Sequence, residues 1–275
     1  MRKLALILSV AALAALGTSC QKLQSRDSLN KGVAAFRNAQ YPEAVEKFKQ
    51  AVELDPTFTT ARLYLATAYM QQYIPGAESP ENVQMAKAAY DQFMTVIGQD
   101  PKNTTAIASI ASLFLDEKKW SDARQWYDKL TSVDPSNADA YYSLGFIAWS
   151  EWYPEYGTAR ANLGMKQDEP GPIKDKKVRD ELKAKWTPVI DGGLQALDKA
   201  LQINPDYDDA MAYENLLIRE RADLMDDKTQ YEQQIKIADD WVAKNLATKK
   251  KKAEEKAKKG GGGITTGGGA GGGAN

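Results

Sequence analysis

The 275-residue chain contains few of the residue types that catalyse reactions or bind metals. Histidine is absent and Cys20 is the only cysteine, which excludes Ser-His-Asp and Cys-His catalytic groups as well as histidine or thiolate zinc sites. Adjacent acids occur at 208–209, 226–227 and 239–240, but neighbouring acids on a helix point in different directions and stay in water. We therefore predict no catalytic residue, no metal site and no cofactor, and we do not expect an enzyme.

Cys20 follows a segment that is typical of exported proteins. A positive Met1-Arg-Lys precedes the apolar stretch 4–16, which is too short to span a membrane as a helix. The next residues, Leu-Gly-Thr-Ser-Cys at 16–20, resemble the lipobox of bacterial lipoproteins. The match departs from that pattern at Gly17, because the family usually has Leu, Val or Ile three residues before the cysteine.

The lipobox resemblance implies a membrane anchor at the start of the mature chain. Residues 1–19 would then be a signal peptide, Cys20 would be lipidated, and residues 20–27 would be a linker. We expect an outer-membrane lipoprotein that faces the periplasm. The alternative is ordinary cleavage after Gly17, which would leave a periplasmic protein with an unpaired thiol.

Aromatic residues between positions 142 and 156 suggest recognition chemistry. Tyrosine and tryptophan side chains offer a large contact area with little conformational entropy to lose, which suits binding of a peptide or a helix. The alternative is that these rings pack beneath the segment that follows them. The residues concerned are Tyr142, Phe146, Trp149, Trp152, Tyr153 and Tyr156.

A repeated set of landmarks indicates the elements that must position these rings. Asp-Pro or Asn-Pro pairs recur, and each is preceded by a small residue at twelve places before the proline, a ring or leucine at eight, and an apolar residue at five. Small residues let two helices approach closely, and proline disfavours helical geometry in the residue before it. The prolines are Pro56, Pro101, Pro135 and Pro205, and the landmarks are Ala44, Ala89, Ala123, Gly193, Phe48, Phe93, Tyr127, Leu197, Ala51, Val96, Leu130 and Ala200.

The segment from Pro101 to Pro135 spans 34 residues and resembles one complete tetratricopeptide repeat (TPR), a helix–turn–helix unit. The resemblance covers residues 28–247 and implies an all-α fold, an α-solenoid that winds as a right-handed superhelix of about five helix pairs. The last pair lacks the closing proline, as expected of a repeat that caps the array. The repeats fall at about 25–58, 59–103, 104–137, 138–207 and 208–247.

Two repeats are longer than 34 residues. The Pro56–Pro101 spacing exceeds this period by 11 residues, which fall in 72–83, and the Pro135–Pro205 spacing exceeds it by 36, which fall in 151–187. We expect the fourth repeat's first helix to end near Trp152, and a helix at 174–186 to lead into its second helix through Pro188. Such insertions often contact the ligand, although 72–83 could also be a tolerated surface loop.

In the family, residues of the first helix of each repeat line the concave groove. The Lys, Asn and Arg set that clamps a C-terminal carboxylate in chaperone-binding members is missing here, so we expect another kind of ligand. Carrying the family positions across gives a predicted partner-binding groove of Tyr64, Met70, Tyr142, Phe146, Trp149 and Tyr213.

The sequence predicts a binding function rather than a reaction. The resemblance implies a protein–protein interaction scaffold or adaptor of the bacterial cell envelope that binds a protein or peptide partner in its groove and the membrane through its N-terminal lipid. A net charge of −1 argues against nucleic acid as a partner. The alternative is a protein that binds a small molecule or glycan in the aromatic pocket of the fourth repeat.

Residues 248–275, basic and then glycine-rich, are expected to be a disordered tail.

Overall fold

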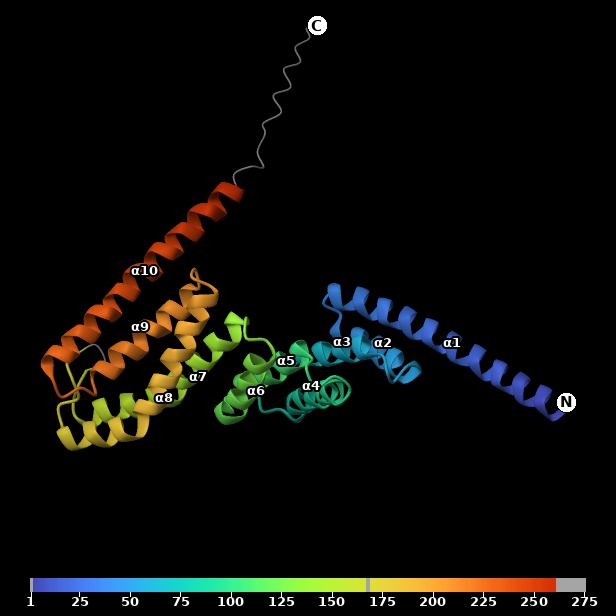
Figure 1. Ribbon diagram of the computed structural model, residues 1–275, viewed down its shortest axis with the longest axis horizontal. Coiled ribbons are helices and arrows are strands. Elements are labelled where there is room, and N and C mark those ends of the chain that lie inside the picture. The colour runs from blue at the N-terminus through green and yellow to red at the C-terminus, as the bar shows by residue number, and fades with distance from the viewer. Residues whose placement is uncertain (1, 167–168, 261–275) are drawn as a thin grey trace, which may run out of the picture. The chain divides into compact units, whose positions relative to one another are not determined.

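The computed structural model describes residues 2–166 and 169–260, and these residues form ten helices (Figure 1). The chain divides into two compact units, residues 1–136 (unit 1) and residues 137–275 (unit 2). Of the expected tail, residues 248–260 belong to the last helix, and the glycine-rich part, 261–275, lies outside the described residues.

Unit 1 consists of three helix pairs. Each first helix packs against the second helix that follows it. The expected linker, residues 20–27, lies inside the long first helix, and the buried Ser25 donates a 2.7 Å hydrogen bond to the Ala51 carbonyl. The helices are α1 (Arg2–Arg37), α2 (Tyr41–Leu54), α3 (Thr59–Met70), α4 (Pro80–Gln99), α5 (Thr104–Asp116) and α6 (Trp120–Val133).

Unit 2 consists of two helix pairs, α7 (Ala138–Asn162) with α8 (Lys176–Ile203) and α9 (Asp208–Ala222) with α10 (Lys228–Gly260). Helix α9 also contacts α7 and α8, and α10 lies along α9 and extends past it (Figure 1). Helices α7 and α9 are the first helices of the fourth and fifth repeats. Because they are in contact, side chains from these two repeats can meet between them.

The predicted repeat landmarks are confirmed. All of the small, ring and apolar landmark residues are buried. The helices α2, α4, α6 and α8 each end one residue before the Asp or Asn of the closing pair. The backbone N–H of that Asp or Asn donates to the carbonyl of the landmark five places before the proline, which satisfies an otherwise unpaired acceptor at the helix end.

The small landmark matters most in the fourth pair, where Gly193 replaces alanine. A Cβ on Gly193 would lie 2.6 Å from the Ala148 Cβ and 3.0 Å from the Leu217 Cδ1. Glycine therefore lets α8 approach both α7 and α9 more closely than any other residue allows.

The first long connection contains a loop that is held by one side chain. Asn82, in the first turn of α4, donates to the carbonyls of Ile74 and Ala77 and accepts from the Ile74 N–H. Ser79 caps the same helix by accepting from the Asn82 N–H. The loop therefore has a defined conformation, and the remaining extra residues lengthen α4.

Of the two helix predictions inside the second long connection, one is wrong and one is confirmed. Helix α7 does not end near Trp152 but continues through Pro154 to Asn162. The helix expected at 174–186 begins at Lys176 and leads through Pro188 into the second helix of the repeat, and the two together are α8. Proline removes one helical hydrogen bond but does not forbid the helix. Apolar side chains on both sides of each proline are buried, so packing outweighs the local signal. These side chains are Trp152, Tyr156, Leu182 and Ile190.

Candidate functional site

Four of the six predicted groove residues form one aromatic cluster in unit 2. Tyr213 of α9 lies at its centre, with ring centroids 5.8 Å from Tyr142, 5.2 Å from Phe146 and 5.3 Å from Trp149 of α7. All four rings are half-buried. Tyr142, Phe146 and Trp149 are three or four residues apart and therefore lie on one face of α7. With Tyr213 they form a half-buried surface, here called the aromatic wall, rather than a closed core.

Trp149 connects this wall to a buried carboxylate. Its Nε1 donates a 3.1 Å hydrogen bond to Glu220 Oε1 of α9, and its ring stacks on Tyr153 with centroids 4.7 Å apart. Glu220 is 5% exposed, and its second oxygen, Oε2, is buried without a hydrogen-bond partner in the described residues.

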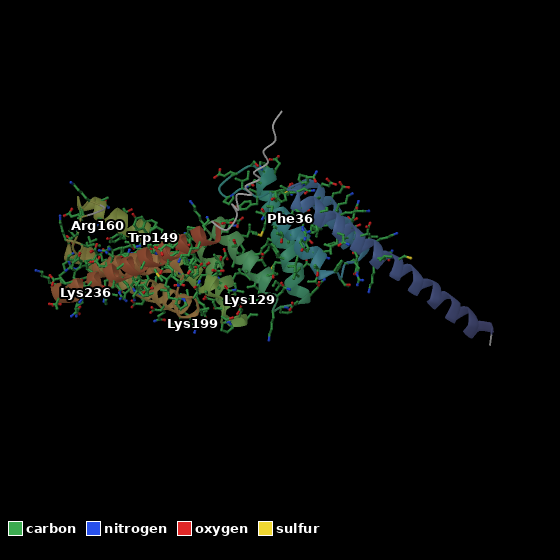
Figure 2. The ribbon with its side chains drawn as sticks, turned by 90° about the horizontal axis from the view of Figure 1, so that it is seen from above. Phe36, Lys129, Trp149, Arg160, Lys199 and Lys236 are labelled. Atoms are coloured by element: carbon green, nitrogen blue, oxygen red, sulfur yellow. The ribbon has the colours of Figure 1, made fainter. Side chains whose placement is uncertain are left out.

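Beside Tyr153 and Glu220 lies a cavity of about 480 Å3, between α7, α9 and the start of the connection after α7. This volume falls in the range typical of small-ligand pockets. Trp149 and Arg160 mark the two ends of this stretch of α7 (Figure 2). The lining residues are Tyr153, Tyr156, Gly157, Arg160, Ala161, Met165, Leu216, Arg219 and Glu220.

A buried ion pair supports one side of the cavity. Arg160 Nη1 lies 2.6 Å from Asp223 Oδ2, which also accepts a 2.6 Å hydrogen bond from the Tyr156 hydroxyl. Arg160 Nη2 donates to the backbone carbonyls of Lys166 and Glu169. The charge of Arg160 is therefore balanced, and its contacts fix the connection that follows α7.

Burial raises the pKa of several acids around this site. It raises the pKa of Glu220 to about 8, although the indole groups of Trp149 and Trp152 oppose the rise. It also raises the pKa of Asp223 to about 6, against the opposing effects of Tyr156 and Arg160. Another buried acid of α9, Glu214, has its pKa raised to about 8 by burial and by the charge of Asp198. Glu214 does not line the cavity.

The other predicted site residues lie apart from this cluster. Tyr64 and Met70 belong to α3 in unit 1, where Tyr64 is exposed and stacks on Phe48 at 5.4 Å. Cys20 is an exposed free thiol on α1. The partner-binding role of the six groove residues and the lipidation of Cys20 remain predictions.

Tyr156, Arg160, Glu220 and Asp223 were not among the predicted site residues. A signal for them is present in the spacing: Trp152, Tyr156 and Arg160 are four residues apart, so a continued α7 places the arginine on the same buried face as the rings. A first helix that ends near Trp152, as the sequence predicted, would not include Arg160.

Two searches of the described residues found nothing. Within 2–166 and 169–260, no group of three or more Cys, Asp or Glu residues is arranged to hold a metal ion. No described helix has both the length and the apolar character needed to cross a membrane.

Comparison with known proteins finds two family models along the chain. A model described as tetratricopeptide repeat matches residues 29–104, and one described as TPR repeat matches residues 111–150.

Among curated proteins, the chain is 25% identical over 174 residues to mitochondrial import receptor subunit TOM70 of Rattus norvegicus, which covers 63% of this chain and 22% of the relative. The human TOM70 is 25% identical over 177 residues, covering 64% and 22%. The chain thus spans about a fifth of the length of these relatives.

Solved structures share the fold at low sequence identity. The crystal structure of MamA protein matches with a TM-score of 0.56 and 16% identity, covering 84% of this chain and 94% of the other. MamA from Desulfovibrio magneticus RS-1 matches with a TM-score of 0.56 and 14% identity, covering 83% and 96%. Together with the confirmed landmarks and the two family models, these matches identify tetratricopeptide repeats in this chain, whose fold is an all-α solenoid of helix pairs.

Proposed function

We propose that this protein is an interaction scaffold that binds a segment of another protein on the aromatic wall formed by α7 and α9. The observation that carries the proposal is the half-buried cluster of Tyr142, Phe146, Trp149 and Tyr213. Rigid rings that are already packed against one another lose little entropy on binding, which makes them effective anchors. The TPR repeats and the similarity to an import receptor subunit support a binding role.

We further propose that the scaffold works in the bacterial cell envelope, anchored at the outer membrane by lipid on Cys20 and facing the periplasm. The support is the positive start, the apolar stretch and the lipobox-like residues before Cys20. Several acyl chains on one residue hold a protein firmly to a bilayer, whereas a single chain holds it weakly.

The anchor is tested by growing cells with a radioactive fatty acid and comparing the natural chain with Cys20→Ala. We expect label in the natural chain and none in the variant. Equal label in both proteins would remove Cys20 as the attachment site.

Scaffolding is tested by crosslinking in native membranes followed by capture of the protein. We expect Phe146→Ala and Trp149→Ala to lose most of the captured partner while the thermal unfolding midpoint stays within a few degrees. Trp126→Ala is the matched control, since Trp126 is a half-buried ring on a second helix, α6, outside the proposed wall. Failure to capture any protein, or equal loss in the control, would contradict the proposal.

The cavity of about 480 Å3 beside Tyr153 favours a second candidate function, the binding of a small molecule or glycan. Denaturing the protein purified from its native cells and analysing the released compounds by mass spectrometry would separate the two. A stoichiometric small compound, with no protein partner captured, would favour this second function.

A further inference from the structure

The cavity between α7 and α9 has walls of two kinds. Tyr153, Gly157 and Ala161 are four residues apart and share one face of α7, where two small residues beside a ring leave open space. Leu216 contributes an aliphatic surface from α9. This arrangement fits a long, slender apolar chain better than a bulky ring.

The charges around the cavity leave one acid without a cation. Arg160 is paired with Asp223 at 2.6 Å, and Arg219 is paired with Asp239 at 2.6 Å. Glu220 forms no salt bridge with the described residues, and its buried Oε2 makes no hydrogen bond of ordinary geometry, although the Trp152 indole lies near enough to favour the charged form. A buried carboxyl oxygen that lacks a hydrogen-bond partner is destabilising, so a ligand that supplies a partner gains free energy from this contact.

We propose that the cavity receives a lysine side chain of the bound partner, with its methylene chain against Gly157, Ala161 and Leu216 and its ammonium group at Glu220 beside the ring of Tyr153. An ammonium group would donate a hydrogen bond to Glu220 and balance its charge once the acid has lost its proton, and nearby aromatic rings attract cations. The inference rests on the proposed scaffold function and adds the chemistry of the segment that is recognised. A free alkylamine carries the same ammonium chemistry.

Binding in this way couples the ligand to a proton. Burial raises the pKa of Glu220 to about 8, so the empty site holds a neutral carboxyl at pH 7 and an arriving ammonium group displaces its proton. The ionisable groups around Glu220 are Arg219 of α9, Asp223 directly after α9, and Arg160 and Tyr156 of α7. Affinity for the cation should therefore rise from pH 6 to pH 9.

The test uses the full chain and small model compounds, with binding followed by NMR shifts of Tyr153, Gly157 and Leu216. The compounds are N-acetyl-lysine methylamide, its norleucine and glutamate counterparts, and 1,5-diaminopentane. We expect the lysine compound to bind at least about tenfold more tightly than norleucine, a difference of about 1.4 kcal/mol. Binding of the diamine alone would point to a free amine as the ligand. Equal binding of norleucine, or tighter binding of glutamate, would overturn the proposal.

Two variants identify the residues. Glu220→Gln should abolish the preference for lysine over norleucine, whereas Glu214→Gln, the other buried acid of the same helix, should retain it. Gly157→Leu should block all of these compounds without unfolding the chain, because a Cβ there meets no atom within 4 Å and leucine favours the helix. Retained preference in Glu220→Gln, or undiminished binding in Gly157→Leu, would contradict the assignment.

These results are independent of partner capture. If no protein is captured from membranes but the lysine compound binds as described, the cation site stands and scaffolding fails. If a partner is captured and norleucine binds as well as lysine, scaffolding stands and the cation site fails.

Discussion

At the scale of single residues, the side chain with the greatest consequence is Glu220. A carboxyl group that is 5% exposed has lost nearly all contact with water, and Trp149 Nε1 donates a hydrogen bond to it. That bond favours the charged form of Glu220, while burial favours the neutral form and is the larger effect. Trp149 is thus part of the aromatic wall and also lowers the pKa of Glu220.

Replacing Trp149 with phenylalanine should raise the pKa of Glu220 above its value of about 8, because the change keeps an aromatic ring but removes the indole donor that favours the charged form. Carbon-13 NMR titration of the glutamate carboxyls measures the shift. Tyr153→Phe is the control, since it keeps the ring and leaves the Trp149 donor in place. An unchanged titration in Trp149→Phe would show that the hydrogen bond has no effect on the acid.

At the scale of elements, the close approach of α8 to α7 and α9 depends on Gly193. A methyl group there would meet the Cβ of Ala148 at 2.6 Å, and a Cβ is fixed by its own backbone and cannot rotate away. The neighbouring Gly192 is exposed, and a Cβ on it meets no atom within 4 Å. A side chain is therefore excluded at Gly193 but has room at the adjacent Gly192.

Gly193→Ala should lower the free energy of unfolding by about 1–3 kcal/mol, since the helices must move apart to accept the methyl group. Gly192→Ala should raise it by about 0.5–1 kcal/mol, because alanine favours the helix and meets no clash. Denaturant unfolding of both variants measures the two changes. A stabilising Gly193→Ala would mean that the helices are not held at this distance.

At the scale of the whole molecule, the two units differ in their buried acids. Among the described residues, Glu214, Glu220 and Asp223 are the buried carboxyl groups, and all of them belong to unit 2. From residue 20 to the end of unit 1, where burial is described, the buried polar residues are Ser25 and Asn82, which do not titrate in the ordinary pH range. The two units should therefore respond differently to pH.

The pH dependence follows from the sign of these shifts. Folding raises the pKa of Glu214 and Glu220 from 4.5 to about 8, so between these values the folded state keeps protons that the unfolded state releases. Their contribution to stability is complete below pH 4.5 and is lost as the pH rises towards 8. Each group lowers the free energy of unfolding by up to about 1.4 kcal/mol per pH unit in this window.

Hydrogen exchange between pH 5 and pH 8, corrected for the intrinsic exchange rate, checks this expectation. Protection should fall in α7–α10 and change much less in α1–α6, because repeats of a solenoid depend mainly on their neighbours. Glu214→Gln should reduce the fall, since it removes one of the buried acids whose pKa is raised by folding. Equal changes in both units, or a fall that Glu214→Gln leaves intact, would contradict the explanation.

The sequence by itself determined the repeat. Its small, ring and apolar residues at set distances before Asp-Pro and Asn-Pro recur because every helix pair must solve the same packing problem, and a proline stops a helix wherever nothing opposes it. For the same reason the meeting of Tyr142, Phe146, Trp149 and Tyr213 could be predicted from family positions on successive first helices. These are local rules that repeat along the chain.

Only the tertiary structure decided how α7 and α8 continue through Pro154 and Pro188. Burial of Trp152, Tyr156 and Leu182 outweighs the missing helical hydrogen bonds, and this energy depends on partners that are distant in sequence. The longer α7 carries Arg160 to Asp223, 63 residues away, and opens the cavity beside Glu220. Contacts of that range leave no fixed spacing in the sequence, so the site appears only when the helices are packed.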